Sequence, residues 1–222
     1  MRGATSIRKR DVGIAPFYQL KDGFVAIAKF PFFPYNKANL MQTKRLFIGI
    51  KLSSLLAKRL IREMGAFADW PIIPTRKENL HVTVLFLGFV AEENLAEILP
   101  AIERAIEGIH PFELRFHQLG YFPNNEHPTA LFVFGEESEE LLRLRKNLDQ
   151  ELGYLVPEKK SFRPHITLGK IRRGKFEALP EKPNFDKSVN FVEPVSSLAL
   201  FESTTEDGKR IYLPIEEFPL GE

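Results

Sequence analysis

Apolar and polar positions along the chain form two kinds of pattern, which predict a mixture of strands and helices. Short apolar or alternating runs predict strands at residues 46–50, 80–87, 112–119, 130–134, 162–168, 195–202 and 209–214. Apolar residues at intervals of three and four predict helices at residues 54–67, 92–106 and 137–152. Because strands and helices are mixed in this order, the sequence favours an α+β domain with helices outside antiparallel sheets.

Residues with strong local preferences mark the predicted boundaries. Ser53 or Ser54 can cap the first helix, and Gly153 is placed to end the third. The segment 122–125, Phe-Pro-Asn-Asn, has the composition of a turn, and Asp207-Gly208 favours a tight loop between the last two strands. These signals indicate where the chain reverses direction.

Residues 1–40 differ from the remainder of the chain. They begin with several basic residues, contain Pro16, Pro31 and Pro34, and show no sustained period. We therefore expect a functional domain over residues 41–222. Residues 1–40 are expected to be an N-terminal extension, either disordered or preceding the true start of the protein.

Composition restricts the functional classes. The 31 basic and 29 acidic residues give a net charge of +2, so no global field that attracts nucleic acid is expected. A local basic patch is compatible with this balance. The chain has no cysteine, which excludes disulfides, thiolate nucleophiles and cysteine-bound metals. No apolar run approaches the roughly 20 residues of a membrane helix, and a secretory signal fits poorly. We expect a cytoplasmic monomer that does not bind a membrane and has no obligate protein partner.

The most informative feature is a tetrapeptide that occurs twice, His-Val-Thr-Val at 81–84 and His-Ile-Thr-Leu at 165–168, in a chain with five histidines. Side chains alternate across a strand, so each histidine shares a face with the threonine two residues later. The intervening apolar residues then face the core. A lone histidine on a strand is more often structural, but two matching copies favour a site made of two halves, facing each other across a cleft.

Paired histidines suit the hydrolysis of a cyclic phosphodiester. Imidazole titrates near neutrality, so one histidine can be a neutral base while the other is a protonated acid. In-line displacement places base and acid on opposite sides of phosphorus. The hydroxyls of Thr83 and Thr167 can then donate to the non-bridging phosphate oxygens.

Metal binding is the rival use of histidine. Here each histidine has a threonine beside it, and no Asp or Glu shares its face within the short runs, so we expect no metal. His110 and His127 each precede proline in loop-like segments, and His117 has no comparable partner.

The residues around the two tetrapeptides resemble a known family. Residues 79–88, Asn-Leu-His-Val-Thr-Val-Leu-Phe-Leu-Gly, and 162–170, Phe-Arg-Pro-His-Ile-Thr-Leu-Gly-Lys, resemble the two signatures of the two-histidine phosphoesterase superfamily. More narrowly they resemble the RNA 2′,3′-cyclic phosphodiesterases historically called 2′-5′ RNA ligases. The resemblance extends over about residues 44–220 and includes the run 45–50 and the ending 200–214.

This resemblance implies a bilobal α+β fold with pseudo-twofold symmetry, in which antiparallel sheets line a central groove. It implies hydrolysis of RNA 2′,3′-cyclic phosphate ends to 2′-phosphomonoesters, without a metal or other cofactor. By analogy His81 is the proton donor to the leaving 3′-oxygen, and His165 is the proton acceptor that activates water. The reverse reaction, with the roles exchanged, joins a 2′,3′-cyclic phosphate to a 5′-hydroxyl.

Several other residues are candidates for binding the substrate. Arg163 and Lys170 flank the second motif, with Arg172 and Arg173 beyond it, and such a cluster can contact RNA phosphates or form a solvated strand end. Phe122 matches a place where relatives carry an aromatic that can stack on a base, although core packing is the commoner role. At Thr129-Ala130 this chain lacks a basic residue that many relatives carry, which puts RNA affinity on that side in doubt.

Two alternatives stay open at this point. The same site can act on a small nucleotide, such as an ADP-ribose cyclic phosphate, or on 2′-5′ linked oligonucleotides. A non-catalytic module that binds nucleotides or RNA is a second alternative, and the presence of both histidines and both threonines counts against it.

Overall fold

The computed structural model describes residues 43–156, 162–183 and 185–221, so the predicted extension, residues 1–40, lies outside the described residues. The strands are β1 (Thr43–Lys51), β2 (Ile72–Pro74), β3 (His81–Ala91), β4 (Phe112–Phe122), β5 (Ala130–Gly135), β6 (His165–Ile171), β7 (Lys187–Val195), β8 (Ser197–Glu206) and β9 (Lys209–Pro219). The helices are α1 (Ser54–Gly65), α2 (Leu95–Ile106), α3 (Glu139–Leu152) and α4 (Arg173–Glu177). Single 3₁₀ turns are η2 (Lys77–Asn79), η3 (Glu92–Asn94) and η4 (Gly153–Leu155).

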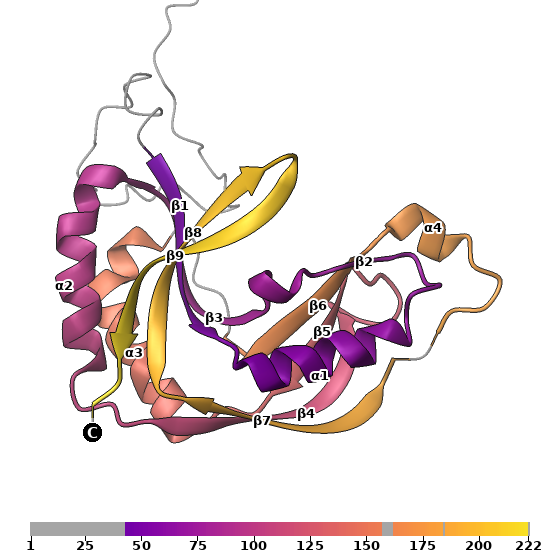
Figure 1. Ribbon diagram of the computed structural model, residues 1–222, viewed down its shortest axis with the longest axis horizontal. Helices are drawn as coiled ribbons and strands as arrows, with labels where there is room; N and C mark the ends of the chain where they lie inside the picture. Colours follow the sequence, from indigo (N-terminus) through magenta and orange to yellow (C-terminus); the bar gives the residue numbers. More distant parts are fainter. Residues whose placement is uncertain (1–42, 157–161, 184, 222) are drawn as a thin grey trace, which may run out of the picture. The chain divides into compact units, whose positions relative to one another are not determined.

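The described strands form one nine-stranded sheet, in the order β7-β4-β5-β6-β3-β1-β8-β9, with β2 paired to β6 (Figure 1). Every pairing in it is antiparallel. The sheet consists of two halves, which we call lobe A (β3, β1, β8 and β9) and lobe B (β7, β4, β5, β6 and β2). Within the described residues, one pair of residues, Val82 and Ile166, joins the halves. The prediction of two antiparallel lobes is therefore confirmed.

The helices cover the two halves separately. α2 and α3 pack together and lie beside lobe A, whereas α1 lies along lobe B (Figure 1). α4 is a short helix beyond the end of β6. No helix in the described part of the chain is long and apolar enough to cross a membrane.

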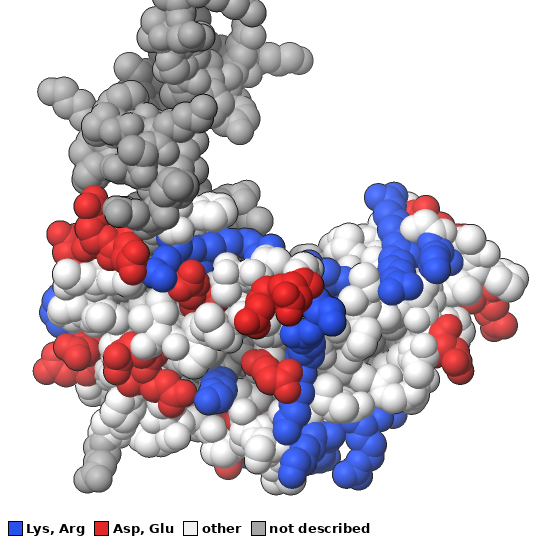
Figure 2. Space-filling model, turned by 45° about the horizontal axis from the view of Figure 1, so that its top comes forward, with Lys and Arg blue, Asp and Glu red and all other residues white. Residues whose placement is uncertain are grey.

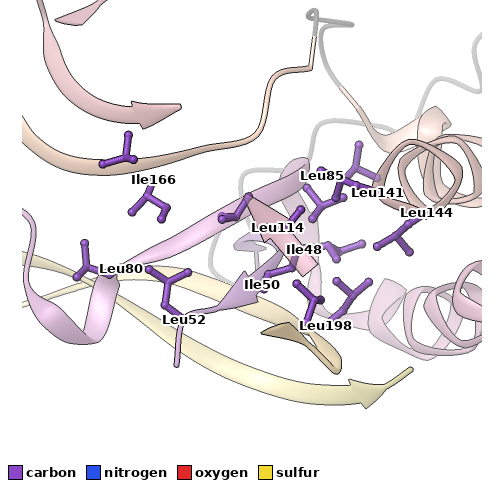
Figure 3. Packing of buried hydrophobic residues seen from close by; sticks show 14 of the residues in the cluster. Ile48, Ile50, Leu52, Leu80, Leu85, Leu114, Leu141, Leu144, Ile166 and Leu198 are labelled. Carbon is purple, nitrogen blue, oxygen red and sulfur yellow. The ribbon is translucent and has the colours of Figure 1, made fainter. Parts of the chain in front are cut away.

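The core follows from the alternation of side chains along the strands. Ile48 and Ile50 of β1 point to one face and belong to one buried cluster with Leu141 and Leu144 of α3, and all four are fully buried (Figure 3). Leu198 of β8 completes the same layer. Each fully buried leucine or isoleucine contributes roughly 1.5–3 kcal/mol through removal from water, so this layer fixes the strands that carry the first motif.

Most of the predicted boundaries are confirmed. Ser53 caps α1 through a hydrogen bond from the Leu56 amide to its hydroxyl, and Glu193 of β7 accepts a second bond from that hydroxyl at 2.8 Å. Asp207 and Gly208 have φ of 49° and 71°, as a tight loop between two strands requires. Asn124 accepts two backbone bonds in the predicted turn, from the amides of residues 126 and 127.

Other boundaries differ from the prediction. Gly153 follows α3 but has φ of −60°, because the chain continues into η4 instead of ending in a left-handed cap. Phe122 is the last residue of β4, not part of the turn. The second motif strand starts at His165 and not at residue 162, since Pro164 lacks the amide that a ladder needs.

The prediction missed β2, α4 and β7. In β7 the alternation of Val189 and Phe191 breaks at Glu193, which is buried, and at Pro194. The sheet tolerates this proline because β7 is an edge strand, where one side of the backbone needs no partner. β2 spans three residues, and α4 spans five, so neither contains enough residues to show a period.

Candidate active site

The pairing of β3 with β6 brings the two histidine motifs together. Val82 is opposite Ile166, and both are completely buried. An antiparallel pair has a local twofold axis, and here it relates His-Val-Thr to His-Ile-Thr. The two histidines and the two threonines therefore lie on one face, opposite the core, as predicted. The two strands are hydrogen-bonded neighbours, however, so the expectation that they face each other across a cleft is wrong.

His81 is held at both ring nitrogens. Its Nδ1 donates to the main-chain oxygen of Asn79 at 2.7 Å, and its Nε2 lies 2.9 Å from the Thr83 hydroxyl. A carbonyl oxygen only accepts, so Nδ1 carries a proton in either charge state. In the neutral ring Nε2 accepts from the hydroxyl, and in the imidazolium Nε2 donates to it. The threonine can therefore accompany a change of protonation without moving.

His165 is held in the same way at one nitrogen. Its Nδ1 donates to the main-chain oxygen of Arg163 at 2.8 Å, again two residues earlier in the chain. Among the described residues this is the one hydrogen bond of the His165 ring. Its Nε2 consequently keeps a lone pair that no described residue occupies.

Aromatic rings enclose both imidazoles. The rings of Phe47 and Tyr212 lie 4.8 and 4.9 Å from the His81 ring, between centroids. Phe132 of β5 stacks on His165 at 4.3 Å, with an interplanar angle of 16°. These contacts fix the orientation of the imidazoles and exclude water from their faces.

Burial controls the protonation of the two histidines. It lowers the pKa of His81 from 6.5 to about 4, against a raising effect of the Asn79 carbonyl, and a positive charge on His165 lowers it further. Burial also lowers the pKa of His165, and the Arg163 guanidinium acts in the same direction, against the Arg163 carbonyl. Burial thus favours the neutral form of both imidazoles in the free protein.

The other predicted site residues have different surroundings. The Arg163 guanidinium lies 4.3 Å from the centroid of the Phe134 ring. Lys170 lines a cavity that also contains the His81 side chain. Phe122 has 46% of its surface exposed and stacks on Phe132 at 4.9 Å, so Phe122, Phe132 and His165 form a continuous stack of rings.

The predicted basic cluster is only partly assembled at the histidines. Arg173 pairs with Glu177 at 2.7 Å within α4, away from the junction of β3 and β6 (Figure 1). Figure 2 shows acidic side chains over α2 and η3, at the left, and basic side chains over α4, at the right. The surface in this view therefore has no single sign, in agreement with the small net charge.

Sequence reasoning missed several residues that shape the site. Phe132 is opposite Thr167 in the β5–β6 pairing, and only that pairing places it on His165. Asn79 is buried and bridges to β9: its side-chain amide donates to the Arg210 carbonyl at 2.8 Å, and the Tyr212 amide donates to its side-chain oxygen at 3.1 Å. An asparagine two residues before His81 was the available signal.

Replacement of Asn79 by alanine is expected to lower the free energy of unfolding by about 2 kcal/mol, because two hydrogen bonds to β9 are lost in a buried position. The bond from His81 to the main chain of residue 79 is retained, so turnover should fall by less than about tenfold. Urea unfolding measures the first effect. The exposed Asn190→Ala on β7 is the control, and equal stability of the two variants would contradict this role.

Among the described residues, no group of three or more His, Cys, Asp or Glu side chains is arranged to hold a metal ion.

Comparisons with known proteins place this arrangement in a family. The family model of the 2′-5′ RNA ligase superfamily matches residues 59–202, which include both motifs. The chain belongs to this superfamily. It is 28% identical to an RNA 2′,3′-cyclic phosphodiesterase of Aquifex aeolicus, over 82% of this chain and 100% of that protein. It is 32% identical to the protein of that name from Thermus thermophilus, over 79% of this chain and 90% of the relative.

The fold is also that of the 2′-5′ RNA ligase superfamily. The crystal structure of TT0787 from Thermus thermophilus matches with a TM-score of 0.70 and 29% identity, over 79% of this chain and 97% of that chain. The resemblance inferred from the two motifs and their flanking residues is thereby confirmed.

Proposed function

We propose that the protein hydrolyses RNA 2′,3′-cyclic phosphodiester ends to 2′-phosphomonoesters, with His81 as the acid and His165 as the base. The observation that carries the proposal is the local twofold axis through Val82 and Ile166. It presents two imidazoles on one face, each with Nδ1 bonded to a carbonyl two residues earlier. The Nε2 atom of each ring is therefore the one directed toward a substrate, with the Thr83 hydroxyl beside that of His81. The similarity to proteins named RNA 2′,3′-cyclic phosphodiesterase supports the substrate class.

The proposed reaction is an in-line displacement at phosphorus. Water attacks as His165 Nε2 removes its proton, the bond from phosphorus to the 3′-oxygen breaks, and His81 Nε2 delivers a proton to that oxygen. The hydroxyls of Thr83 and Thr167 donate to the non-bridging oxygens, where negative charge increases. The product keeps its phosphate on the 2′-oxygen. The reverse sequence, with the roles exchanged, gives 2′-5′ ligation to a 5′-hydroxyl.

Hydrogen bonding supports this division of roles. The lone pair of His165 Nε2 has no partner among the described residues and is free to take a proton. His81 Nε2 is already paired with the Thr83 hydroxyl, which can stabilise the protonated ring as an acceptor. His81 is enclosed by aromatic rings, so a phosphate anion beside it acts in a medium of low dielectric constant and raises its pKa strongly.

The pH profiles of kcat/KM and kcat should differ, because the first reports the free protein and the second reports the complex with substrate. The pH profile of kcat/KM reports the pKa values of the acid and the base in the free protein, where one histidine must be charged and the other neutral. In the free protein the pKa values of both histidines lie below 6.5. We therefore expect kcat/KM to be maximal below pH 6.5 and to fall above it. The profile of kcat should lie at higher pH, because the bound anion favours the imidazolium. Initial rates between pH 4 and 9 measure both, and a kcat/KM optimum above pH 7 would contradict the burial effect.

Product analysis tests the reaction itself. An oligonucleotide ending in a 2′,3′-cyclic phosphate should give only a 2′-phosphomonoester, detected by phosphorus NMR, and EDTA should leave the rate unchanged. A 3′-phosphate product would show that the 2′-oxygen, and not the 3′-oxygen, is the leaving group. Turnover of an ADP-ribose cyclic phosphate or of 2′-5′ linkages, but not of the oligonucleotide, would favour the alternative substrates. Binding of adenosine monophosphate without any turnover would favour a non-catalytic module.

A further inference from the structure

A second cluster of functional groups lies beside His81, where lobe A meets β6 of lobe B. It lines a cavity of about 190 Å³ and consists of Arg45 of β1, Arg210 of β9, Lys170 of β6 and Ser203 of β8. Phe86 and Tyr212 provide aromatic surface in the same cavity. None of the described residues that line it is acidic. Three cations from three strands therefore converge where no carboxylate of the described residues neutralises them.

The two arginines of this cluster differ from two other basic side chains nearby, which form ion pairs. Neighbouring lysines are paired: Lys44 with Glu202 at 2.8 Å and Lys51 with Glu217 at 3.3 Å. Within the described part of the chain, Arg45 and Arg210 have no such carboxylate partner. Cations that remain unpaired beside paired neighbours indicate a site for an anion.

Arg210 is also held in a fixed relation to His81. Asn79 provides the link, because its main-chain oxygen receives the His81 Nδ1 proton and its side-chain amide donates to the Arg210 carbonyl. The Arg210 guanidinium donates to the Ser203 hydroxyl at 2.9 Å. The arginine is therefore preorganised relative to the imidazole, which suits a site that must align two parts of one ligand.

A bulge in β3 brings Phe86 to this site. In strict alternation Phe86 would share the buried face of Val82 and Val84. The β1–β3 register shifts between Ile48 and Gly49: Ile48 is opposite Leu85, whereas Gly49 is opposite Thr83. One step along β1 therefore corresponds to two steps along β3, which is a β-bulge. Phe86 consequently lies on the histidine face and is 52% exposed at the cavity. An exposed aromatic ring beside cations is the combination that binds single-stranded nucleic acid.

The proposed chemistry indicates which part of a substrate reaches this cavity. In-line displacement puts water on the His165 side of phosphorus and the 3′-oxygen on the His81 side. The 3′-oxygen belongs to the terminal ribose, so this ribose and the chain on its 5′ side lie toward His81. The next anion along that chain is the phosphodiester that joins the terminal nucleotide to its neighbour.

We propose that Arg45 and Arg210 bind this internucleotide phosphodiester, with Phe86 beside it as a surface for a base. The inference rests on the proposed function and extends it: the protein recognises an oligonucleotide end, in preference to an isolated nucleoside cyclic phosphate. Lys170 lies in the same cavity and adds positive charge. Binding at this second phosphate then aligns the reacting one between the histidines.

Three substrates test the proposal: adenosine 2′,3′-cyclic phosphate, its 5′-phosphorylated form, and a dinucleotide ending in the cyclic phosphate. For the wild-type protein kcat/KM should be about tenfold or more higher for the two substrates that carry the second phosphate. In Arg45→Ala and Arg210→Ala this advantage should shrink about tenfold, and it should also decrease with salt. Arg104→Ala, on α2 and paired with Glu151, is the matched control and should keep the wild-type ratio. Equal kcat/KM for all three substrates in the wild type would overturn the proposal.

Binding measurements separate this inference from the proposed reaction. Calorimetry should show adenosine 2′,5′-bisphosphate binding about tenfold more tightly than adenosine 2′-monophosphate, and Arg45→Ala should lose this advantage. If the advantage is found but no cyclic phosphate is turned over, the proposed function fails and the second site stands. If turnover is found with equal affinity for the two nucleotides, the second site fails alone.

Discussion

Replacement of either His81 or His165 by alanine is expected to lower kcat for a 2′,3′-cyclic phosphate by about a hundredfold to ten-thousandfold. Each histidine carries out one proton transfer in the proposed displacement, and removal of a positioned acid or base typically costs about 10²–10⁴-fold. Rates on a cyclic-phosphate-ended oligonucleotide measure the loss. His110→Ala, at an exposed position, is the matched control and should keep full activity.

Stability provides the necessary check on these variants. Both histidines are partly enclosed by aromatic rings, so each alanine variant should still unfold cooperatively, with a modest change in midpoint. If a folded variant at either position keeps more than about a tenth of the wild-type rate, that histidine is not the acid or base of this reaction.

A change of leaving group distinguishes the two roles. Bis(4-nitrophenyl) phosphate releases a stable phenolate that needs no proton, so removal of a general acid should matter little for it. His81→Ala should therefore lose much less activity on this ester than on the cyclic phosphate. His165→Ala should lose similar activity on both, because water must be deprotonated in either case. The opposite pattern would exchange the roles of acid and base.

The central part of this site was predictable because strand periodicity is local. A histidine and a threonine two residues apart share a face in any strand, and the doubled motif favoured a site made of two such strands. The structure confirms these faces, since Val82 and Ile166 are buried. The relation between the strands was not predictable from the motifs alone: adjacent pairing, not opposition across a cleft, creates the local twofold axis.

The residues beyond the motifs depend on register and irregularity, which the sequence pattern does not show. Phe86 reaches the site through a bulge, and Phe132 reaches His165 through the pairing of β5 with β6. Arg45 and Arg210 are far apart in the chain and meet because β1 and β9 both pair with β8. A basic residue next to a motif, such as Arg173, was easier to notice but pairs within α4 instead.

Gly49 shows how a residue without functional groups controls the same site. It is buried in β1, opposite Thr83 of β3. A Cβ atom at this position would lie 2.8 Å from the main-chain oxygen of Val82, closer than such contacts allow, and 3.4 Å from the Phe47 ring. The backbone oxygen cannot rotate away, so β3 would have to move at the one residue through which the described lobes are paired.

Gly49→Ala is therefore expected to lower the free energy of unfolding by about 1–3 kcal/mol, the usual cost of an overpacked core. It should also reduce kcat about tenfold to a hundredfold, because a displacement of about 1 Å between acid and base has effects of that size. Gly65→Ala is the matched control: it ends α1, and an added Cβ there would meet nothing within 4 Å. That variant should be unchanged or up to about 1 kcal/mol more stable, with full activity. Urea unfolding together with oligonucleotide turnover measures both, and wild-type values for Gly49→Ala would show that β3 can shift without disturbing the histidines.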